Sequence, residues 1–368
     1  MNLAFLNSNY SYVPDGDLTV EEFDIAVVGG GPAGAVTALC LARSGWRIAL
    51  FERRSFDQSR TGETLPPEIN PVLRSLGLWE AFLSQAPLES PGIVSVWGSS
   101  VPNAVDFTDN PFGCGWHVDR KRFDRMLCQE AVDAGAKLFL NSAATFTRKA
   151  DLWESGEVCA RFLVDAMGRN GLFVDHKRDC EQEDSLLAIV LPLSNCRAQP
   201  QDLRTCIEAA PAGWWYSTWL PDRVGVAMFF TGAEVYREAG ISIAEQLRAA
   251  SLTRRRLGEG CLEEPRIVHT PSGLRKTVFG ADWVAVGDSA SSYDPLSGRG
   301  IFKALRHGQV AARAIDAQLR GDPAGMHRYG AQVKQQFEQY ARQRRRYYSL
   351  ERRWLDEPFW RVRRLAAN

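Results

Sequence analysis

Apolar and polar runs near the start of the chain predict a strand, a helix and a second strand in succession. Residues 23–28 read FDIAVV, a short apolar run with the β-branched content of a buried parallel strand. Residues 35–44 are rich in Ala and Leu, which favours a helix that Gly45 ends. Residues 46–51 read WRIALF and predict the second strand. Together these runs predict a β-α-β unit.

Helical and strand-like patterns continue to alternate along the chain. Helices are expected at 69–85, from about 120 to 135, at 300–319 and at 324–350, and strand-like runs at 93–97, 137–165 and 283–288. Residues 176–267 have a different pattern. Four apolar runs between turn residues predict a largely antiparallel sheet, with strands at 186–193, 203–210, 214–221 and 224–230. An amphipathic helix at 243–252 follows.

These patterns predict an α/β fold in which a mostly antiparallel β domain is inserted into a nucleotide-binding domain. The nucleotide-binding domain is assigned to residues 23–84, 115–175 and 268–323. The inserted domain, expected to hold the substrate, is assigned to 85–114 and 176–267. Residues 324–368 form a C-terminal helical region.

Composition and charge exclude several classes of protein. The chain has 368 residues and a formal net charge of zero, which argues against bulk attraction to nucleic acid or to anionic membrane. No apolar run approaches the ~20 residues that a membrane span needs. Residues 1–22 are polar and acidic, so we expect a poorly ordered leader and not a secretory signal. The eight cysteines show no metal-ligand spacing and suit a reducing compartment. We therefore expect a cytoplasmic protein with no metal site.

The turn inside the β-α-β unit carries the pattern G-x-G-x-x-G. Gly29 allows the tight turn, Gly31 lets the backbone approach a pyrophosphate, and Gly34 lets the helix pack closely on the strand. The pyrophosphate would meet the free N–H groups and the positive end of the helix dipole. This turn therefore predicts a dinucleotide site, whose candidate residues are Gly29, Gly31, Pro32, Ala33, Gly34, Glu52 and Arg53. Glu52, at the end of the second strand, can accept hydrogen bonds from a ribose.

Three later motifs follow in a characteristic order. They are Asp119-Arg120 with Phe123-Asp124, then Asp165-Ala166-Met167-Gly168, then Gly287-Asp288 with residues 294–301. With the glycine turn, this order resembles the FAD-dependent hydroxylases and halogenases built on the p-hydroxybenzoate hydroxylase plan. The resemblance covers residues 23 to about 319 and implies FAD as cofactor and a Rossmann-like domain of the glutathione-reductase-2 type.

The resemblance also implies roles for individual residues. Arg120 would contact the diphosphate or ribityl region, and Asp288 the ribityl chain or pyrophosphate. Pro295 and the turn 298–301 would lie beside the isoalloxazine ring, where a helix beginning near Gly300 would stabilise the negative charge of reduced flavin. The further cofactor-binding candidates are Arg120, Asp165, Gly168, Gly287, Asp288, Pro295, Gly298, Gly300 and Ile301.

The chain has no second strand–G-x-G-x-x-G–helix unit and no C-x-x-x-x-C redox pair. A dedicated NAD(P)H domain is therefore not expected. The electrons would come from transient contact with NAD(P)H or from a separate reductase.

Two features argue against halogenation. The segment Gly62-Glu63-Thr64-Leu65-Pro66-Pro67 resembles G-E-[ST]-L-P-P of tryptophan-halogenase-like flavoproteins. Those enzymes need a lysine shortly after this segment, but this chain has none before Lys121. They also carry W-x-W-x-I-P, where residues 216–221 here read YSTWLP.

A narrower resemblance remains. Residues 62–67, 213–216 and 297–301, and the tail with its Tyr, Trp and Arg residues, resemble the LodB/GoxB type of flavoprotein, which matures amino-acid oxidases that carry cysteine tryptophylquinone. The likeness implies a monooxygenase whose partner is the precursor of such an oxidase and whose substrate is a tryptophan side chain in it. The alternatives are an FAD monooxygenase or reductase for a small aromatic or lipid molecule, and a non-catalytic FAD-binding chaperone.

Candidate catalytic residues are few because the flavin supplies the oxidising power. Glu63 and His117 are proposed because each neighbours a cofactor segment. Glu63 has helix capping as its alternative role, and His117 has a structural role as its alternative. Trp97, Trp116 and Trp215 could line an aromatic pocket or simply form core. The arginine-rich stretch 342–353 is expected to be a solvated helix face or a docking surface for an acidic partner.

Overall fold

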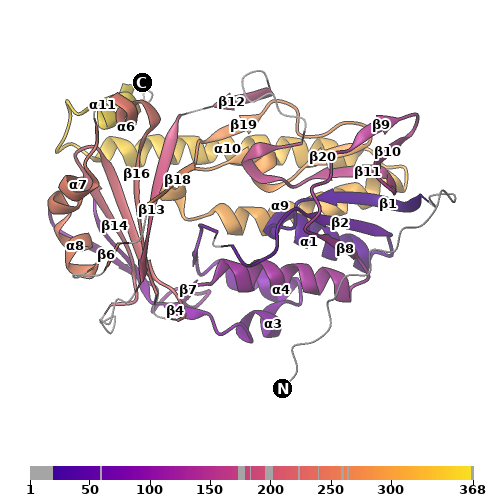
Figure 1. Ribbon diagram of the computed structural model, residues 1–368, viewed down its shortest axis with the longest axis horizontal. Helices are drawn as coiled ribbons and strands as arrows, with labels where there is room; N and C mark the ends of the chain where they lie inside the picture. The colour runs from indigo at the N-terminus through magenta and orange to yellow at the C-terminus, as the bar shows by residue number, and fades with distance from the viewer. Residues whose placement is uncertain are drawn as a thin grey trace, which may run out of the picture.

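The computed structural model describes residues 20–58, 60–172, 179–182, 184–194, 202–222, 224–238, 240–257, 261–262 and 265–365. The leader expected at 1–22 lies outside these residues up to position 19, but Glu21 and Glu22 already belong to the first strand. The α/β fold class is confirmed: a partly parallel sheet with helices packs beside a large, mostly antiparallel sheet (Figure 1).

The β-α-β unit forms as predicted, with shifted limits. Strand β1 (Glu21–Val28) and strand β2 (Ile48–Glu52) pair in parallel, and helix α1 (Pro32–Arg43) connects them. The helix begins three residues earlier than expected because Pro32 occupies its first turn, where a missing N–H has no cost. Gly31 is its N-cap.

The sheet around this unit has the order β8-β2-β1-β11-β10-β9, with β20 paired to β11. Its other strands are β8 (Lys137–Leu140), β9 (Thr147–Lys149), β10 (Leu152–Ser155), β11 (Val158–Asp165) and β20 (Trp283–Ala285). The strand expected at 283–288 thus ends at Ala285, and a 3₁₀ turn, Gly287–Ser289, follows. Helices α4 (Arg120–Asp133) and α9 (Gly300–Leu319) pack on α1.

The large sheet has the order β17-β13-β16-β15-β14-β5-β6, with β18 paired to β13. Its strands are β5 (Gly92–Val96), β6 (Asn103–Asp106), β13 (Leu186–Ser194), β14 (Thr205–Ala210), β15 (Gly213–Trp219), β16 (Gly225–Gly232), β17 (Cys261–Leu262) and β18 (Arg266–His269). Every pair in it is antiparallel except β14 with β5. The two parts of the chain expected in the inserted domain therefore meet in one sheet, while the domain limits themselves stay predictions.

Two small sheets lie between the larger ones. One joins β3 (Thr64–Leu65), β7 (Gly115–His117) and β4 (Leu88–Ser90). The other joins β12 (Cys180–Gln182), β19 (Gly273–Arg275) and β21 (Ser291–Ser292).

Two expected helices are each broken in two. The helix expected at 69–85 forms as α2 (Ile69–Ser75) and α3 (Trp79–Leu83), because Gly77 between them has φ 67°, which a helix cannot contain. The helix expected at 243–252 forms as α7 (Ile243–Ala249) and α8 (Ser251–Leu257). Helix α6 (Ala233–Glu238) precedes them.

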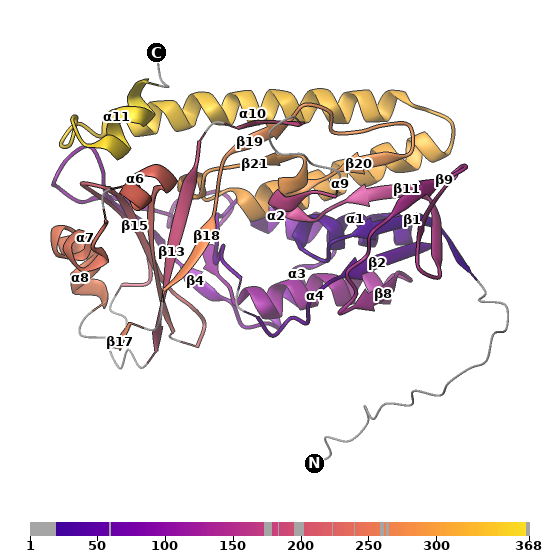
Figure 2. The same cartoon turned by 45° about the horizontal axis from the view of Figure 1, so that its top comes forward.

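The long helix α10 (Ala324–Leu350) runs across both sheets, and α11 (Pro358–Leu365) follows at the end of the large sheet; Figure 2 shows this arrangement from a second side. Arg344 and Tyr348 of α10 are buried, which corrects the expectation that the whole arginine-rich stretch is a surface. Among the described residues, no helix has the length and apolar character for a membrane crossing.

Side chains alternate across the large sheet, as the strand period requires. On one face Ala188, Met228 and Phe230 point toward the α/β part. On the other face Trp215, Phe229 and their neighbours pack under α7. The first face therefore closes the space in which a site can form.

Candidate active site

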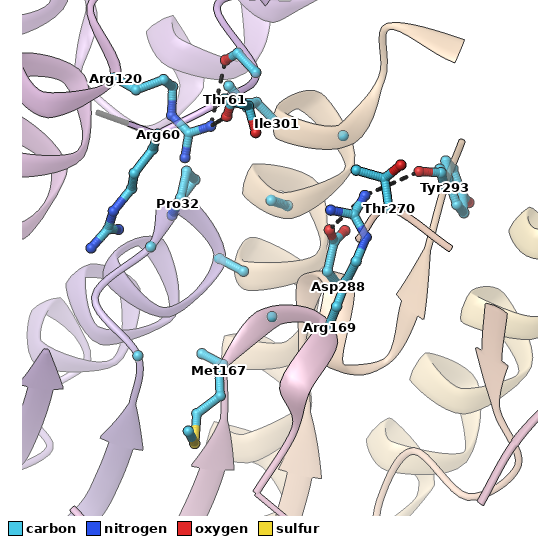
Figure 3. Close-up of a pocket in the computed structure, with 18 of the residues that line it drawn as sticks. Pro32, Arg60, Thr61, Arg120, Met167, Arg169, Thr270, Asp288, Tyr293 and Ile301 are labelled. Atoms are coloured by element: carbon cyan, nitrogen blue, oxygen red, sulfur yellow. Dashed lines mark hydrogen bonds and ion pairs between the residues drawn. The ribbon is translucent and has the colours of Figure 1, made fainter. Parts of the chain in front are cut away.

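A cavity of about 570 Å³ lies between the α/β sheet and the large sheet. Its lining comes from the glycine turn, the loop after β2, the segment 60–64, and the loops 166–169 and 286–304. Ala188, Tyr216, Met228 and Phe230 of the large sheet complete it. Arg60 and Arg120 lie on one side of the cavity, and Arg169, Asp288 and Tyr293 lie on the other (Figure 3).

The three motif glycines occupy different surroundings. A Cβ atom at Gly31 would meet nothing within 4 Å, so the backbone there faces open space in the cavity. A Cβ at Gly34 would lie 1.9 Å from the carbonyl oxygen of Gly29. Gly29 itself has φ 114° and would clash with the carbonyl of Ala166. Gly29 and Gly34 thus serve close packing, whereas Gly31 leaves room for a ligand beside the start of α1.

Glu52 lies at the end of β2 and lines the cavity with Arg53. Its Oε2 accepts a hydrogen bond from the backbone N–H of Gly30 at 3.1 Å. Its Oε1 accepts one from the N–H of Arg54 at 3.1 Å and lies 3.0 Å from Arg60. The carboxylate is therefore held at the rim of the glycine turn.

Arg120, at the start of α4, also lines the cavity. Asp124, one helical turn later, accepts hydrogen bonds from its Nε and from one terminal nitrogen, both at 3.0 Å. The other terminal nitrogen donates to the carbonyls of Thr61 and Gly62. These contacts fix the guanidinium between the segment 60–64 and α4.

Asp288 lies in the 3₁₀ turn after β20 and carries negative charge in the cavity wall. Lys303 donates to its carboxylate at 2.7 Å, and Arg169 lies 3.4 Å away. Burial alone would raise the pKa of Asp288, but Lys303 and Arg169 more than offset it and the pKa is lowered. Asp288 is thus an anion that can accept hydrogen bonds from a ligand's hydroxyl groups.

The loop before α9 forms the wall opposite the glycine turn. Asp294 caps its 3₁₀ turn, Pro295–Ser297, by accepting from the N–H of Leu296. Gly298 has φ 60°, and a Cβ at Gly298 or Gly300 would meet nothing within 4 Å. Pro295, Gly298, Gly300 and Ile301 all line the cavity, at the open N-terminus of a 20-residue helix.

The predicted residues that do not line the cavity support the ones that do. Gly287 has φ 63°, and a Cβ atom added there would lie 2.7 Å from the Cβ of Ala33 in α1. Ala33 and Gly168 do line the cavity. The Asp165 carboxylate is buried, where it pairs with Arg275 at 2.9 Å and accepts from the N–H of Leu172. The assignment of all these predicted residues to cofactor binding stays a prediction.

Glu63 is a buried carboxyl group in the cavity wall. Burial raises its pKa to about 7, although Arg120 and the hydrogen bond from the N–H of Gly62 act in the opposite direction. A group with this pKa can both accept and release a proton near neutrality, as a general acid or base must.

His117 is fully buried behind the lining. Its ring nitrogens lie 2.8 Å from the carbonyl of Leu203 and 3.0 Å from the hydroxyl of Thr218. Burial lowers its pKa to about 4, so the ring is neutral at physiological pH. Thr64, 3.3 Å from the ring, contacts the hydroxyl of Tyr216 at 2.5 Å. Among the described residues, His117 is thus connected to the cavity lining through Thr64 and Tyr216.

The lining residues that sequence reasoning missed include Arg60, Arg169 and Tyr216. The first two directly neighbour motifs that were recognised, so the signal was present for them. Tyr216 lies on a strand whose inward face could be assigned only from the pairing of the sheet. Trp116 and Trp215, considered as pocket walls, are buried in core away from the lining, and Trp97 packs against Trp214 and Trp360.

The residues present fit FAD. The glycine turn leaves open space beside a helix N-terminus, which suits a pyrophosphate. The buried Nε of Arg169 has no hydrogen-bond partner among the described residues and is available to an anionic or hydroxylated ligand.

Two family models match the chain. The model described as tryptophan halogenase matches residues 99–368, and the model described as FAD binding domain matches residues 22–171. The FAD-dependent oxidoreductase LodB of Marinomonas mediterranea is 28% identical over 374 residues, covering 94% of this chain and 97% of LodB. The tryptophan 2-halogenase of Chondromyces crocatus is 26% identical over 323 residues, covering 81% of this chain but only 62% of that enzyme.

The solved structures that share the fold include two flavoenzymes. The flavin-dependent halogenase CmlS has a TM-score of 0.81 and 25% identity, with 94% of this chain and 68% of CmlS covered. QhpG, described as a peptidyl tryptophan dihydroxylase essential for tryptophylquinone cofactor biogenesis, has a TM-score of 0.74 and 24% identity, with coverages of 93% and 79%. The comparisons confirm FAD as the cofactor, a flavin-dependent oxidoreductase, and the predicted likeness to LodB.

Proposed function

The chain belongs to the tryptophan halogenase family of FAD-binding proteins, and we propose that it oxygenates a tryptophan side chain in a partner protein. The partner would be the precursor of a quinone-cofactor amino-acid oxidase, and the oxygenation a step toward its tryptophylquinone. The family also contains halogenases, so membership alone does not fix the reaction.

The observation that carries the proposal is the composition of the cavity wall. The described residues that line it include Glu63, Thr64 and Tyr216 but no lysine. Lys303 is buried, and its ammonium is held by Asp288 and the carbonyl of Ser291. The lysine that halogenation requires therefore has no counterpart among these lining residues. The near full-length match to LodB and the fold of QhpG, whose name specifies a peptidyl tryptophan, support the same choice.

The chain's own residues would hold FAD along the cavity. The glycine turn and α1 would bind the pyrophosphate, with Glu52 at the ribose and Asp288 and Arg120 near the ribityl chain. Pro295 and the N-terminus of α9 would lie beside the flavin ring. When bound, FAD supplies the oxidising power of the reaction with O₂.

The remaining task of the protein is to position the indole ring and move a proton. Ala188, Met228 and Phe230 form an apolar wall that excludes water. Replacing a ring hydrogen by a hydroxyl group requires the ring to release one proton, and the carboxylate of Glu63 would accept it. The hydroxyl of Tyr216, held by Thr64, would orient the ring through a hydrogen bond.

A second candidate is an FAD monooxygenase or reductase for a small aromatic or lipid molecule. The apolar face of Met228 and Phe230 would bind such a ligand equally well. For both candidate functions, the reducing equivalents would come from NAD(P)H or from a separate reductase.

The test is to express the precursor of a tryptophylquinone oxidase from the same organism with and without this protein. Peptide mass spectra should show oxygen on one tryptophan only when the protein and an intact glycine turn are present. If the precursor matures equally well without the protein, or with its Gly31→Val variant, the proposal fails. Oxygen consumption coupled to free indole or phenol would then support the small-molecule reading.

A further inference from the structure

A group of oxidisable aromatic side chains extends from the cavity to the protein surface. We call it the aromatic chain; it consists of Tyr348, Trp214, Trp97, Trp360 and Trp354. Its members come from the large sheet, the end of α10 and the segment around α11, which lie together at one end of the molecule (Figures 1 and 2). None of them takes part in the proposed reaction.

The aromatic chain contacts the cavity lining at two points. The hydroxyl of Tyr348 donates a hydrogen bond of 2.8 Å to Asp294, which lines the cavity beside Pro295. Phe230, another lining residue, stacks on Trp214 with 4.0 Å between ring centroids and 15° between planes. The indole N–H of Trp214 donates to the hydroxyl of Tyr348 at 3.0 Å.

From there the rings continue in near contact toward solvent. Trp97 lies 5.7 Å from Tyr348 and 6.3 Å from Trp214 by ring centroids. Trp360 lies 5.3 Å from Trp97. Trp354 stacks on Trp360 at 6.2 Å and is partly exposed, with Arg353 over its face.

Packing alone does not require this composition. The cluster on the opposite face of the same sheet is filled largely by Ile, Leu, Phe and Ala, with one tryptophan, Trp215. Tryptophan and tyrosine are the aromatic side chains that lose an electron most readily. Electron transfer between rings in near contact is fast, because tunnelling decays steeply with distance. Tyrosine must also lose a proton on oxidation, and the carboxylate of Asp294 is placed to receive it.

We propose that the aromatic chain conducts an electron from Trp354 at the surface to light-excited oxidised FAD, a one-electron oxidant, in the cavity. Tyr348 gives one electron to the oxidant and its phenolic proton to Asp294. It then regains an electron from Trp97 or Trp360 and its proton from Asp294. The electron deficit passes to Trp354, where a one-electron reductant in solution, such as ascorbate, supplies the missing electron. The aromatic chain would thus carry the oxidising equivalent of light-excited FAD away from the substrate site.

Blue light provides the oxidant on demand, because light-excited oxidised FAD is a strong one-electron acceptor. The FAD-loaded protein is irradiated without O₂ in the presence of ascorbate, and loss of the oxidised flavin absorbance is followed. Ascorbate loses one electron and one proton for each electron that reaches FAD. The rate is compared among the wild type and the variants Tyr348→Phe, Trp360→Phe, Trp354→Phe and Trp215→Phe.

The matched control is Trp215, which neighbours Trp214 on β15 and is equally buried but faces the other side of the sheet. We expect Tyr348→Phe, Trp360→Phe and Trp354→Phe to lose most of the photoreduction rate, while Trp215→Phe keeps it. Trp354→Phe changes only a partly exposed ring, so it tests conduction even if a buried variant binds FAD poorly. The proposal would be overturned if the three variants of the aromatic chain kept the wild-type photoreduction rate. It would also be overturned if Trp215→Phe lost as much of that rate as they do.

Discussion

Glu63 is buried beside Arg120, and burial raises the pKa of its carboxyl group from 4.5 to about 7. If the carboxylate accepts the proton from the ring, the oxygenation rate of the wild type rises with pH and levels off above about 7. Glu63→Gln should lower the rate by ~10²–10⁴-fold and remove this inflection. Glu80→Gln, an exposed substitution on α3, should leave the profile unchanged. The same inflection in Glu63→Gln would exclude Glu63 as the base.

The same pKa shift predicts how stability depends on pH. Below pH 4.5 Glu63 is protonated in both the folded and the unfolded chain, so it does not lower the free energy of unfolding. Between pH 4.5 and about 7 the unfolded chain loses the proton first, and the free energy of unfolding falls. Above that range the cofactor-free wild type should be less stable than Glu63→Gln by up to about 3 kcal/mol. Urea unfolding at acid and neutral pH measures the difference in stability between the wild type and Glu63→Gln. The same difference at both pH values would refute this prediction.

Gly31 and Gly34 lie three residues apart but should fail in different ways. The side chain of Gly31→Val points into open space at a φ of −74°, so the protein should fold normally and lose FAD. Gly34→Ala places a methyl group 1.9 Å from a backbone oxygen and should cost roughly 1–3 kcal/mol or more of stability. Thermal unfolding and flavin absorbance separate the two effects. FAD bound at wild-type affinity by a folded Gly31→Val protein would contradict the assignment of the turn.

At the scale of single residues, motifs predicted most of the lining. Gly31, Glu52 and Asp288 lie in the cavity wall because strand–turn–helix geometry places the ends of parallel strands together. Tyr216 could not be assigned, because its orientation depends on how β15 pairs with β14 and β16. His117 neighbours a recognised motif but lies behind the wall, and one sequence gives no signal of that depth.

At the scale of elements, α10 is joined to the loop that would lie beside the flavin. Arg344 forms ion pairs with Asp184 and Asp294, and all three side chains are at most 8% exposed. Arg344→Ala leaves both carboxylates buried without their cation, so we expect a loss of about 3–5 kcal/mol of stability and weaker FAD binding. Arg342→Ala, on the exposed face of the same helix, should change stability by no more than about 0.5 kcal/mol. Equal effects in urea unfolding would contradict this account.

Helix limits show what local pattern can and cannot predict. The break between α2 and α3 has a local cause in Gly77, so it could have been predicted. The break before α8 has a distant cause: the carboxylate of Glu208 on β14 accepts hydrogen bonds from the N–H groups of Leu252 and Thr253. Residues 243–257 alone cannot predict a helix cap that another element supplies.

At the scale of the whole molecule, the order of motifs predicted the two-sheet architecture, because it resembles a known plan. The cavity itself could not be predicted, since its far wall is one face of the large sheet and its loop wall is fixed by α10. That wall of apolar side chains with Glu63 and Tyr216 is what a tryptophan side chain would meet.

Purified components give the sharpest test of tryptophan oxygenation by this protein. The precursor, this protein, FAD, a flavin reductase and NADH are combined under isotopically heavy O₂ with bromide present, and precursor peptides are analysed by mass spectrometry. We predict heavy oxygen on one tryptophan, lost with Gly31→Val and without NADH. Bromine on that tryptophan, or no added oxygen while flavin turnover continues, would show that the protein does not oxygenate tryptophan.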